Sequence, residues 1–184
     1  MKRWVYELIY RFVPVDMIFG SSPKIEKFVE LAINGRIAPC KAITLGCGVG
    51  RETIYLAKKG FDVIGLDFSP TAIKKARRRA KAAVVEIEFI VDDLTNLRHV
   101  EGTFDLVTDF GALNDMSQKS RDQYMENVLP LTHPGSQYLM FCFDKMLSPV
   151  EVTRRFEEYF SIEVLETRPE GFPGTLSFYL MTRR

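Results

Sequence analysis

Apolar residues along this chain come in short runs separated by glycine, proline and charged residues. The run Ala42–Leu45 is too short for a helix and is followed by glycine, so it predicts a buried strand. Between Arg51 and Gly60 the apolar positions follow helical spacing instead, and the glycine is the stop signal. Val63–Leu66 predicts a second strand, which ends at the acidic residue Asp67. We therefore expect a strand–loop–helix–strand unit around which the rest of the chain is organised.

Strand and helix patterns continue to alternate beyond this unit. Further strands are predicted over Glu86–Val91, Phe104–Thr108, Gln137–Phe143, Ile162–Thr167 and Leu176–Met181. Further helices are predicted from Pro70 to about Ala82, over Ser120–Val128, and from Pro149 to about Tyr159. The last two strands are joined by a short loop rich in glycine and proline, which implies an antiparallel hairpin. These patterns place the chain in the α/β class.

The start of the chain has a different pattern. Residues 2–12 predict an amphipathic helix, and its apolar positions share one face: Trp4, Val5, Leu8, Ile9 and Phe12. This helix either packs on the body of the protein or forms a lid over a ligand. Ser22-Pro23 predicts the start of a second helix that runs through Leu31 and is closed by Asn34-Gly35.

Composition narrows the functional classes. The 184 residues are 46% hydrophobic and 27% charged, as in ordinary soluble globular proteins, and the formal net charge of +1 argues against a general nucleic-acid footprint. The helix after Pro70 is rich in lysine and arginine. A nucleic-acid patch is one interpretation, but we favour a solvated outer face because no aromatic residues are interleaved.

Two further observations bear on location and on metals. Cys40, Cys47 and Cys142 are widely spaced and form no C-x-x-C motif, which suits reduced thiols in a cytosol. No stretch approaches the roughly 18 apolar residues that a membrane span needs. We expect a cytoplasmic protein without a metal site.

The loop after the first strand carries the clearest chemical signal. Gly46, Gly48 and Gly50 alternate with other residues, which lets the backbone turn sharply and lets a ligand approach the main chain closely. Asp67 ends the neighbouring strand, where a carboxylate can accept both hydroxyls of a ribose. A ligand that contains a ribose is therefore predicted here.

The glycine spacing separates two families of ribose-binding sites. A dinucleotide site has G-x-G-x-x-G, which would place its third glycine at Arg51, whereas here that glycine is Gly50. The G-x-G-x-G spacing, the following stretch Gly65–Pro70 and the acid Asp93 after the third strand resemble the class I S-adenosylmethionine-dependent methyltransferases. The resemblance runs from about Ile43 to the C-terminus.

This resemblance implies a Rossmann-like three-layer αβα sandwich. Its sheet would have seven mostly parallel strands and end in a C-terminal antiparallel hairpin. Residues 1–184 would form a single methyltransferase domain, in which residues 1–35 are an N-terminal helical lid segment and residues 36–184 are the cofactor-binding core.

The resemblance also implies S-adenosylmethionine as the cofactor and gives roles to individual residues. Asp67 would hold the ribose and Phe68 would cover one face of the adenine. Asp93 would accept from the adenine amino group, the alternative being a capping acid at a strand end, and the backbone amide of Leu94 would meet the ring. The glycine loop, where the small side chain of Cys47 fits, would lie against the methionine and ribose parts.

Four further positions complete the implied cofactor site. Arg51 either pairs with the cofactor carboxylate or projects into solvent. Thr44 stands where the family usually has an acid that reaches the methionine ammonium, and backbone carbonyls at Asp109 and Phe110 would bind that ammonium. The cofactor-binding candidates are therefore Thr44, Gly46, Cys47, Gly48, Gly50, Arg51, Asp67, Phe68, Asp93, Leu94, Asp109 and Phe110.

No catalytic acid or base is assigned. Asn114 and Asp115 fall where many family members carry a histidine pair, and the Asn-Pro-Pro-aromatic signature of methylation on nucleobases or glutamine is absent. Methyl transfer from a sulfonium needs alignment and exclusion of water rather than a dedicated base. The candidate substrate-binding residues are Phe19, Asn114, Asp115, Phe143 and Phe172.

The leader around Pro14-Val15-Asp16 also resembles that of the small thiopurine, tellurite-resistance and halide methyltransferases, which usually have Pro-Trp-Asp there. We carry over the topology of these enzymes and not their substrate. Because the compact chain leaves no room for a substrate-recognition domain, we expect a methyltransferase that acts on a small-molecule acceptor, with no nucleic-acid or membrane partner. One alternative is a non-catalytic protein that binds S-adenosylmethionine. A nicotinamide-dependent oxidoreductase is disfavoured by Arg51 and by the terminal hairpin.

Overall fold

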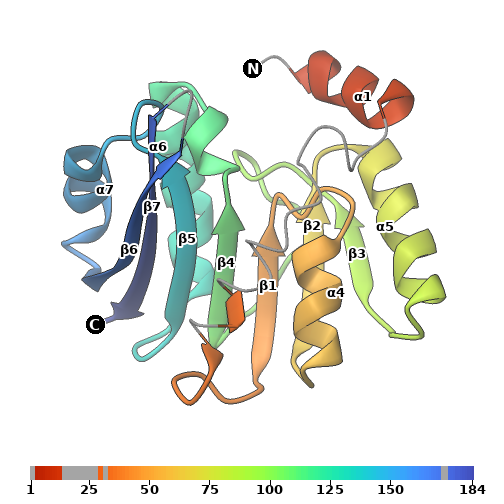
Figure 1. Ribbon diagram of the computed structural model, residues 1–184, viewed down its shortest axis with the longest axis horizontal. Helices are drawn as coiled ribbons and strands as arrows, with labels where there is room; N and C mark the ends of the chain where they lie inside the picture. The colour runs from red at the N-terminus through yellow and green to blue at the C-terminus, as the bar shows by residue number, and fades with distance from the viewer. Residues whose placement is uncertain (1–2, 14–28, 31–32, 171–173) are drawn as a thin grey trace. The chain divides into compact units, whose positions relative to one another are not determined.

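The computed structural model describes residues 3–13, 29–30, 33–170 and 174–184 (Figure 1). The leader motif at residues 14–16, the candidates Phe19 and Phe172, and all but residues 29–30 of the helix expected from Ser22-Pro23 to Leu31 lie outside these ranges. The seven strands have the order β3-β2-β1-β4-β5-β7-β6, mostly parallel with an antiparallel C-terminal pair. The predicted fold class is confirmed. The chain divides into two compact units, Met1–Asp93 and Leu94–Arg184.

The first unit contains the predicted strand–loop–helix–strand element. Its main elements are β1 (Lys41–Leu45), α4 (Arg51–Lys58), β2 (Asp62–Asp67), α5 (Pro70–Ala82) and β3 (Glu88–Val91). The strands β1 and β2 pair in parallel, as do β2 and β3. Apart from their first residues, β1 and β2 are almost entirely buried, which explains why they are continuous apolar runs.

Local sequence signals set the helix boundaries in this unit. Helix α5 begins at Pro70 because the side chain of Ser69 accepts a hydrogen bond from the Ala72 amide at 3.0 Å. Helix α4 has no side-chain cap, and its N-terminus is formed by Gly50 at a φ of 78°. Strand β3 is two residues shorter than predicted because it starts at Glu88.

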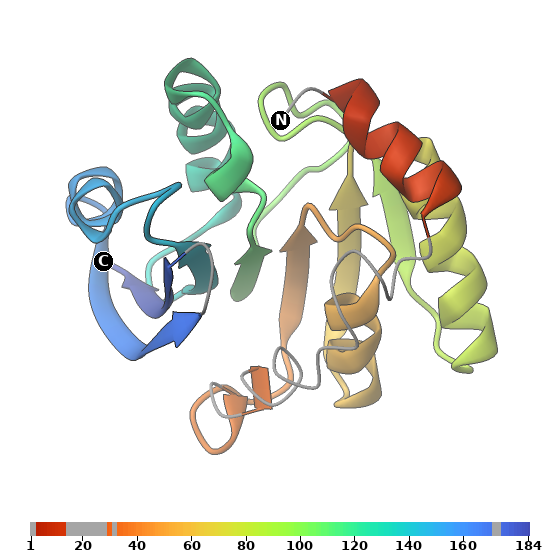
Figure 2. The ribbon, with the colours of Figure 1, turned by 45° about the horizontal axis from the view of Figure 1, so that its top comes forward.

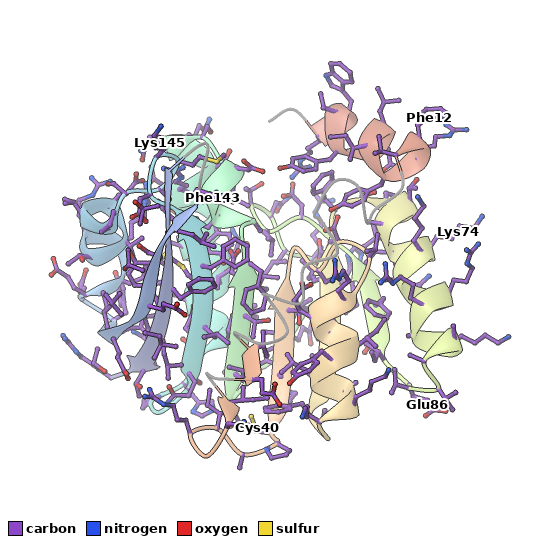
Figure 3. All side chains as sticks on the ribbon, in the orientation of Figure 1. Phe12, Cys40, Lys74, Glu86, Phe143 and Lys145 are labelled. Carbon is purple, nitrogen blue, oxygen red and sulfur yellow. The ribbon has the colours of Figure 1, made fainter. Side chains whose placement is uncertain are left out.

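Helix α1 (Arg3–Phe12) lies beside α5 (Figures 1 and 2). The predicted helix is confirmed, but its contact face differs from the apolar face of the sequence. Tyr10 is buried against Val49 and Ala72, whereas Trp4, Leu8 and Phe12 are 61%, 44% and 71% exposed. Figure 3 shows Phe12 at the outer side of the helix.

The second unit is built from alternating strands and helices followed by a hairpin. Its elements are β4 (Leu106–Phe110), η1 (Leu113–Asp115), α6 (Gln118–Val128), η2 (Leu129–Leu131), β5 (Gln137–Phe143), α7 (Pro149–Phe156), β6 (Phe160–Glu170) and β7 (Gly174–Arg183). The strands β4 and β5 are parallel, and β7 lies antiparallel between β5 and β6. Three buried aromatic rings, Tyr138, Phe156 and Phe160, pack against one another in its core.

Several boundaries in this unit differ from the predicted ones. Strand β4 starts two residues later than expected because Phe104 bonds elsewhere: its amide donates to the Leu131 carbonyl and its carbonyl accepts from the Ser136 hydroxyl. Helix α7 ends at Phe156, before the expected end, and β6 and β7 extend beyond the predicted hairpin. Within the described ranges, no helix has the length and apolarity needed to cross a membrane.

The positive φ of Gly50 leads to the first testable prediction. A Cβ at this position would lie 3.0 Å from Ala76 Cβ and from the Phe89 ring, whereas a Cβ at Gly135, also at positive φ, would meet no atom within 4 Å. Gly135→Ala therefore carries only backbone strain, and we expect it to lower the free energy of unfolding by about 1 kcal/mol. Gly50→Ala adds overpacking, so we expect a loss of about 2–5 kcal/mol. Urea denaturation of both variants measures this difference, and equal losses would contradict the packing argument.

Candidate functional site

The loop between β1 and α4 forms a compact glycine-rich turn. Gly46, Gly48 and Gly50 all have positive φ, at 62°, 53° and 78°, which other residues adopt only with strain. The Cys47 amide donates to the Leu66 carbonyl at 2.8 Å, which ties the loop to β2, and the Cys47 carbonyl accepts from the Gly50 amide at 2.9 Å. The alternating glycines of the sequence are therefore required by the backbone itself.

Cys47 serves packing rather than thiol chemistry. Its side chain belongs to a buried cluster that includes Ile73 and Phe89. Burial raises the pKa of the thiol well above its ordinary value, so the nucleophilic thiolate is disfavoured. The small size of Cys47, rather than the reactivity of its thiol, therefore explains its place in the glycine loop.

Asp67 joins the glycine loop to the start of α5. Its Oδ2 accepts from the Gly48 amide and its Oδ1 from the Ser69 amide, both at 2.9 Å. The residue is 3% exposed, and burial raises the pKa of its carboxyl to about 6 although the two hydrogen bonds act in the opposite direction. Each carboxylate oxygen keeps a lone pair beyond its backbone partner, so both can accept a further hydroxyl.

Phe68 and Asp93 are both contacted by the first turn of α1. The Arg3 guanidinium forms an ion pair with the Asp93 carboxylate and lies 5.4 Å from the centre of the Phe68 ring. The Tyr6 ring meets Phe68 edge-on at a centroid distance of 6.0 Å. The two residues expected to hold adenine are therefore brought together, and α1 is the element that contacts them both.

Thr44 is a buried polar residue near the end of β1. It is 1% exposed, and its Oγ1 has no hydrogen-bond partner among the described residues. An unsatisfied buried hydroxyl costs free energy, so a ligand donor or acceptor at this position would be stabilising. Arg51, the first residue of α4, is half-buried.

The carboxylate of Asp109 is committed to the turn after β4. It accepts from the amides of Gly111, Ala112 and Leu113 at 2.7–3.1 Å and from the Tyr124 hydroxyl at 2.6 Å. Burial raises the pKa of this carboxyl. Its side chain therefore shapes the turn at the strand end.

Phe110 and Leu94 complete the candidate cofactor residues of the second unit. Phe110 is half-buried at the end of β4, and the centre of its ring lies 5.6 Å from that of Phe141. Leu94, the first residue of the unit, is 7% exposed. Both side chains are apolar and at least partly buried.

Two of the predicted substrate residues, Asn114 and Phe143, are brought together by a hydrogen bond. The Asn114 Oδ1 accepts from the Phe143 amide at 3.2 Å, and its Nδ2 donates to the Met146 sulfur at 3.3 Å. Asn114 is buried, so its amide holds the chain at the end of β5, whose last residue, Phe143, is labelled in Figure 3. Asp115 is half-buried, and burial raises the pKa of its carboxyl.

Arg121 organises the same region and was missed in the sequence. It is 5% exposed and donates to the carbonyls of Leu113, Asn114 and Met146 at 2.6–3.2 Å, while its Nη1 pairs with Glu151 at 2.9 Å. It shares a helical face with Tyr124 and Val128, three and seven residues later. That spacing was the available signal that this arginine is buried.

Three residues of α1 were also missed. The carboxylate of Glu7 hydrogen-bonds the hydroxyls of Ser69 and Thr71, and the Tyr10 hydroxyl lies 3.0 Å from the position of a Cβ on Gly48. With Tyr6 they lie on one face of the helix. They were missed because the apolar residues on the other face of the helix form the more regular pattern. Among the residues that the structure describes, no group of three His, Cys, Asp or Glu side chains could hold a metal ion.

Comparison with known proteins identifies the family of this chain. Residues 42–135 match the family model described as "Methyltransferase domain". A 2-heptyl-1-hydroxyquinolin-4(1H)-one methyltransferase of Mycobacteroides abscessus is 29% identical over 132 residues, which are 71% of this chain and 56% of that protein. The chain thus spans little more than half the length of this relative.

Two solved structures show the same fold at low sequence identity. A TehB-like SAM-dependent methyltransferase of Corynebacterium glutamicum has a TM-score of 0.76 and 20% identity, with complete coverage of both chains. The magnesium protoporphyrin IX methyltransferase of Synechocystis with bound SAM has a TM-score of 0.78 and 19% identity, and the match covers 94% of this chain and 84% of that one.

We predict that the Arg121 hydrogen bonds stabilise the second unit. Arg121→Met would leave three carbonyls without this partner, so the free energy of unfolding should fall by about 3 kcal/mol or more. Arg154→Met, at an exposed position of α7, is the control and should change it by less than about 0.5 kcal/mol. Chemical denaturation measures both variants, and similar values for the two would refute the role of Arg121.

The raised pKa of Asp67 predicts a pH dependence of stability. Because the carboxyl has a pKa of about 6 in the folded protein and an ordinary aspartate has a pKa of 3.8, the native state binds the proton more tightly. Between pH 6 and about 4, the free energy of unfolding of the natural protein should rise as pH falls, relative to Asp67→Asn. The gain should be on the order of 2–3 kcal/mol. Urea denaturation at a series of pH values tests this, and parallel profiles for the two proteins would contradict it.

Proposed function

Because the chain belongs to the methyltransferase domain family, we propose that it transfers a methyl group from S-adenosylmethionine to a small-molecule acceptor. The observation that carries this proposal is Asp67, a buried carboxylate that is fixed by the glycine loop and by the start of α5 and still has acceptor capacity for two hydroxyls. This arrangement suits the ribose of S-adenosylmethionine.

Other features of the chain fit the same cofactor. The three positive-φ glycines form a tight backbone turn at the end of β1, where ligands bind in open α/β sheets. The orphaned hydroxyl of Thr44 would gain a partner from the methionine part. Phe68 and Asp93 offer an aromatic face and a carboxylate, the two groups that recognise an adenine ring and its amine.

In this proposal the protein acts by positioning. When bound, S-adenosylmethionine would supply a methyl group that is activated by its sulfonium sulfur. The glycine loop and Asp67 would fix the cofactor's orientation, and Phe110 and Phe143 would offer an apolar lining that excludes water from an acceptor. No side chain needs to move a proton if the acceptor is a thiolate or a neutral amine, which agrees with the absence of an assigned base.

The relatives and the aromatic character of the candidate residues support a particular class of acceptor. The M. abscessus relative is named for a hydroxyquinolone, and the Synechocystis structure for a magnesium porphyrin. Both are flat aromatic molecules, which suits stacking on phenylalanine rings. We therefore propose a flat, largely apolar small molecule as the acceptor.

The proposal predicts that cofactor affinity depends on Asp67. S-adenosylmethionine and S-adenosylhomocysteine should bind to the natural protein in isothermal titration. Asp67→Asn should weaken binding by roughly 10- to 100-fold because a carboxylate acceptor for the ribose is lost. Asp62→Asn, at the exposed first position of the same strand, is the matched control and should bind normally.

Activity is then measured by mass spectrometry on flat hydroxylated aromatics, small thiols and amines. Methylated product would support the enzyme, and cofactor affinity without turnover across the panel would favour the non-catalytic alternative. Absence of binding at millimolar ligand would refute the proposed cofactor.

A further inference from the structure

Helix α1 presents a polar and aromatic face to the rest of the first unit. Arg3, Tyr6, Glu7 and Tyr10 have the spacing i, i+3, i+4, i+7, which places them on one side of a helix. Glu7 hydrogen-bonds Ser69 and Thr71, and Tyr6 and Tyr10 pack in a cluster with Val49 and Ala72. These contacts hold the middle and the end of the helix in place.

Arg3 stands apart from these anchors because it is the first residue of the helix. Its side chain is 57% exposed and reaches the Asp93 carboxylate, whose own side chain is 28% exposed. The same guanidinium lies over the Phe68 ring at 5.4 Å from its centre. One side chain therefore contacts both groups that the proposed function assigns to adenine.

The chemistry of the guanidinium resembles that of the adenine edge. Both are planar, both present N–H donors to a carboxylate in their plane, and both lie favourably over an aromatic face. A guanidinium bound to Asp93 and placed over Phe68 thus satisfies the same acceptor and the same ring that adenine would use.

We propose that Arg3 occupies the adenine subsite and competes with the cofactor, so that release of this side chain sets the cofactor affinity. The inference rests on the proposed function, because it requires adenine to bind at Asp93 and Phe68. The Arg3 side chain is the group that has to leave Asp93, while Glu7 and Tyr10 keep the helix attached. Arg3 is thereby a residue that determines affinity without taking part in methyl transfer.

The expected size of the effect is modest. A partly exposed ion pair and a cation–π contact together correspond to a preference of about three- to tenfold for the occupied subsite. The apparent affinity of the cofactor is reduced by about the same factor, because only the fraction of molecules with a vacant subsite can bind.

The test measures the affinity for S-adenosylhomocysteine and for adenosine by isothermal titration on the natural protein, Arg3→Ala and Arg11→Ala. Arg11 is an exposed arginine on the same helix and is the matched control. We expect Arg3→Ala to bind both ligands about three- to tenfold more tightly and Arg11→Ala to bind them like the natural protein. Unchanged or weaker binding to Arg3→Ala, with normal binding to the natural protein, would overturn the inference and leave the proposed function intact.

A second measurement separates competition from a structural effect on α1. The side-chain Nε–H resonance of Arg3, identified by its absence in Arg3→Ala, should shift and exchange faster with solvent when S-adenosylhomocysteine is added. The helical amide signals of α1 should persist during the titration. A resonance that stays unchanged at saturation would show that Arg3 keeps its partner and would refute displacement. If neither ligand binds any of the proteins, the proposed function itself fails.

Discussion

The first unit depends on one buried carboxylate. Asp67 accepts from the Gly48 amide on one side and from the Ser69 amide on the other, so it fixes the glycine loop against the first residues of α5. A charge at 3% exposure carries a desolvation cost, which is why the pKa of this carboxyl is raised to about 6. The two amide bonds offset part of that cost. The chain thus maintains a desolvated, acceptor-rich position at the strand end where a ligand would bind, as is common at functional sites.

Much of the first unit could be predicted because its signals are local. Alternating glycines, the stop at Gly60 and the Ser69-Pro70 cap each act within a few residues, and α5 has the predicted boundaries. Strand β4 was less predictable because the backbone of Phe104 bonds Leu131 and Ser136, which are distant in sequence. Long-range pairing of this kind leaves little trace in the local pattern.

The same difference between local and long-range signals explains why only some residues of the candidate site could be predicted. Asp67, Phe68 and Asp93 could be predicted because they lie at or just after the ends of strands. The carboxyl ends of parallel strands meet at one edge of the sheet, so position along the chain indicates position at that edge. The role of Arg121 depends on three carbonyls that only folding brings together. The contact face of α1 was hidden because Trp4, Leu8 and Phe12 make the stronger apolar pattern, although Tyr10 is the buried residue. Polar partners such as Ser69 and Thr71 explain why a less apolar face is used.

The crystal structure of the protein with S-adenosylhomocysteine tests the central claim most directly. The account predicts both ribose hydroxyls on the Asp67 carboxylate, adenine against Phe68 and Asp93, and the Arg3 side chain displaced from that carboxylate. A ligand bound elsewhere, with Asp67 making no contact to it, would contradict the account.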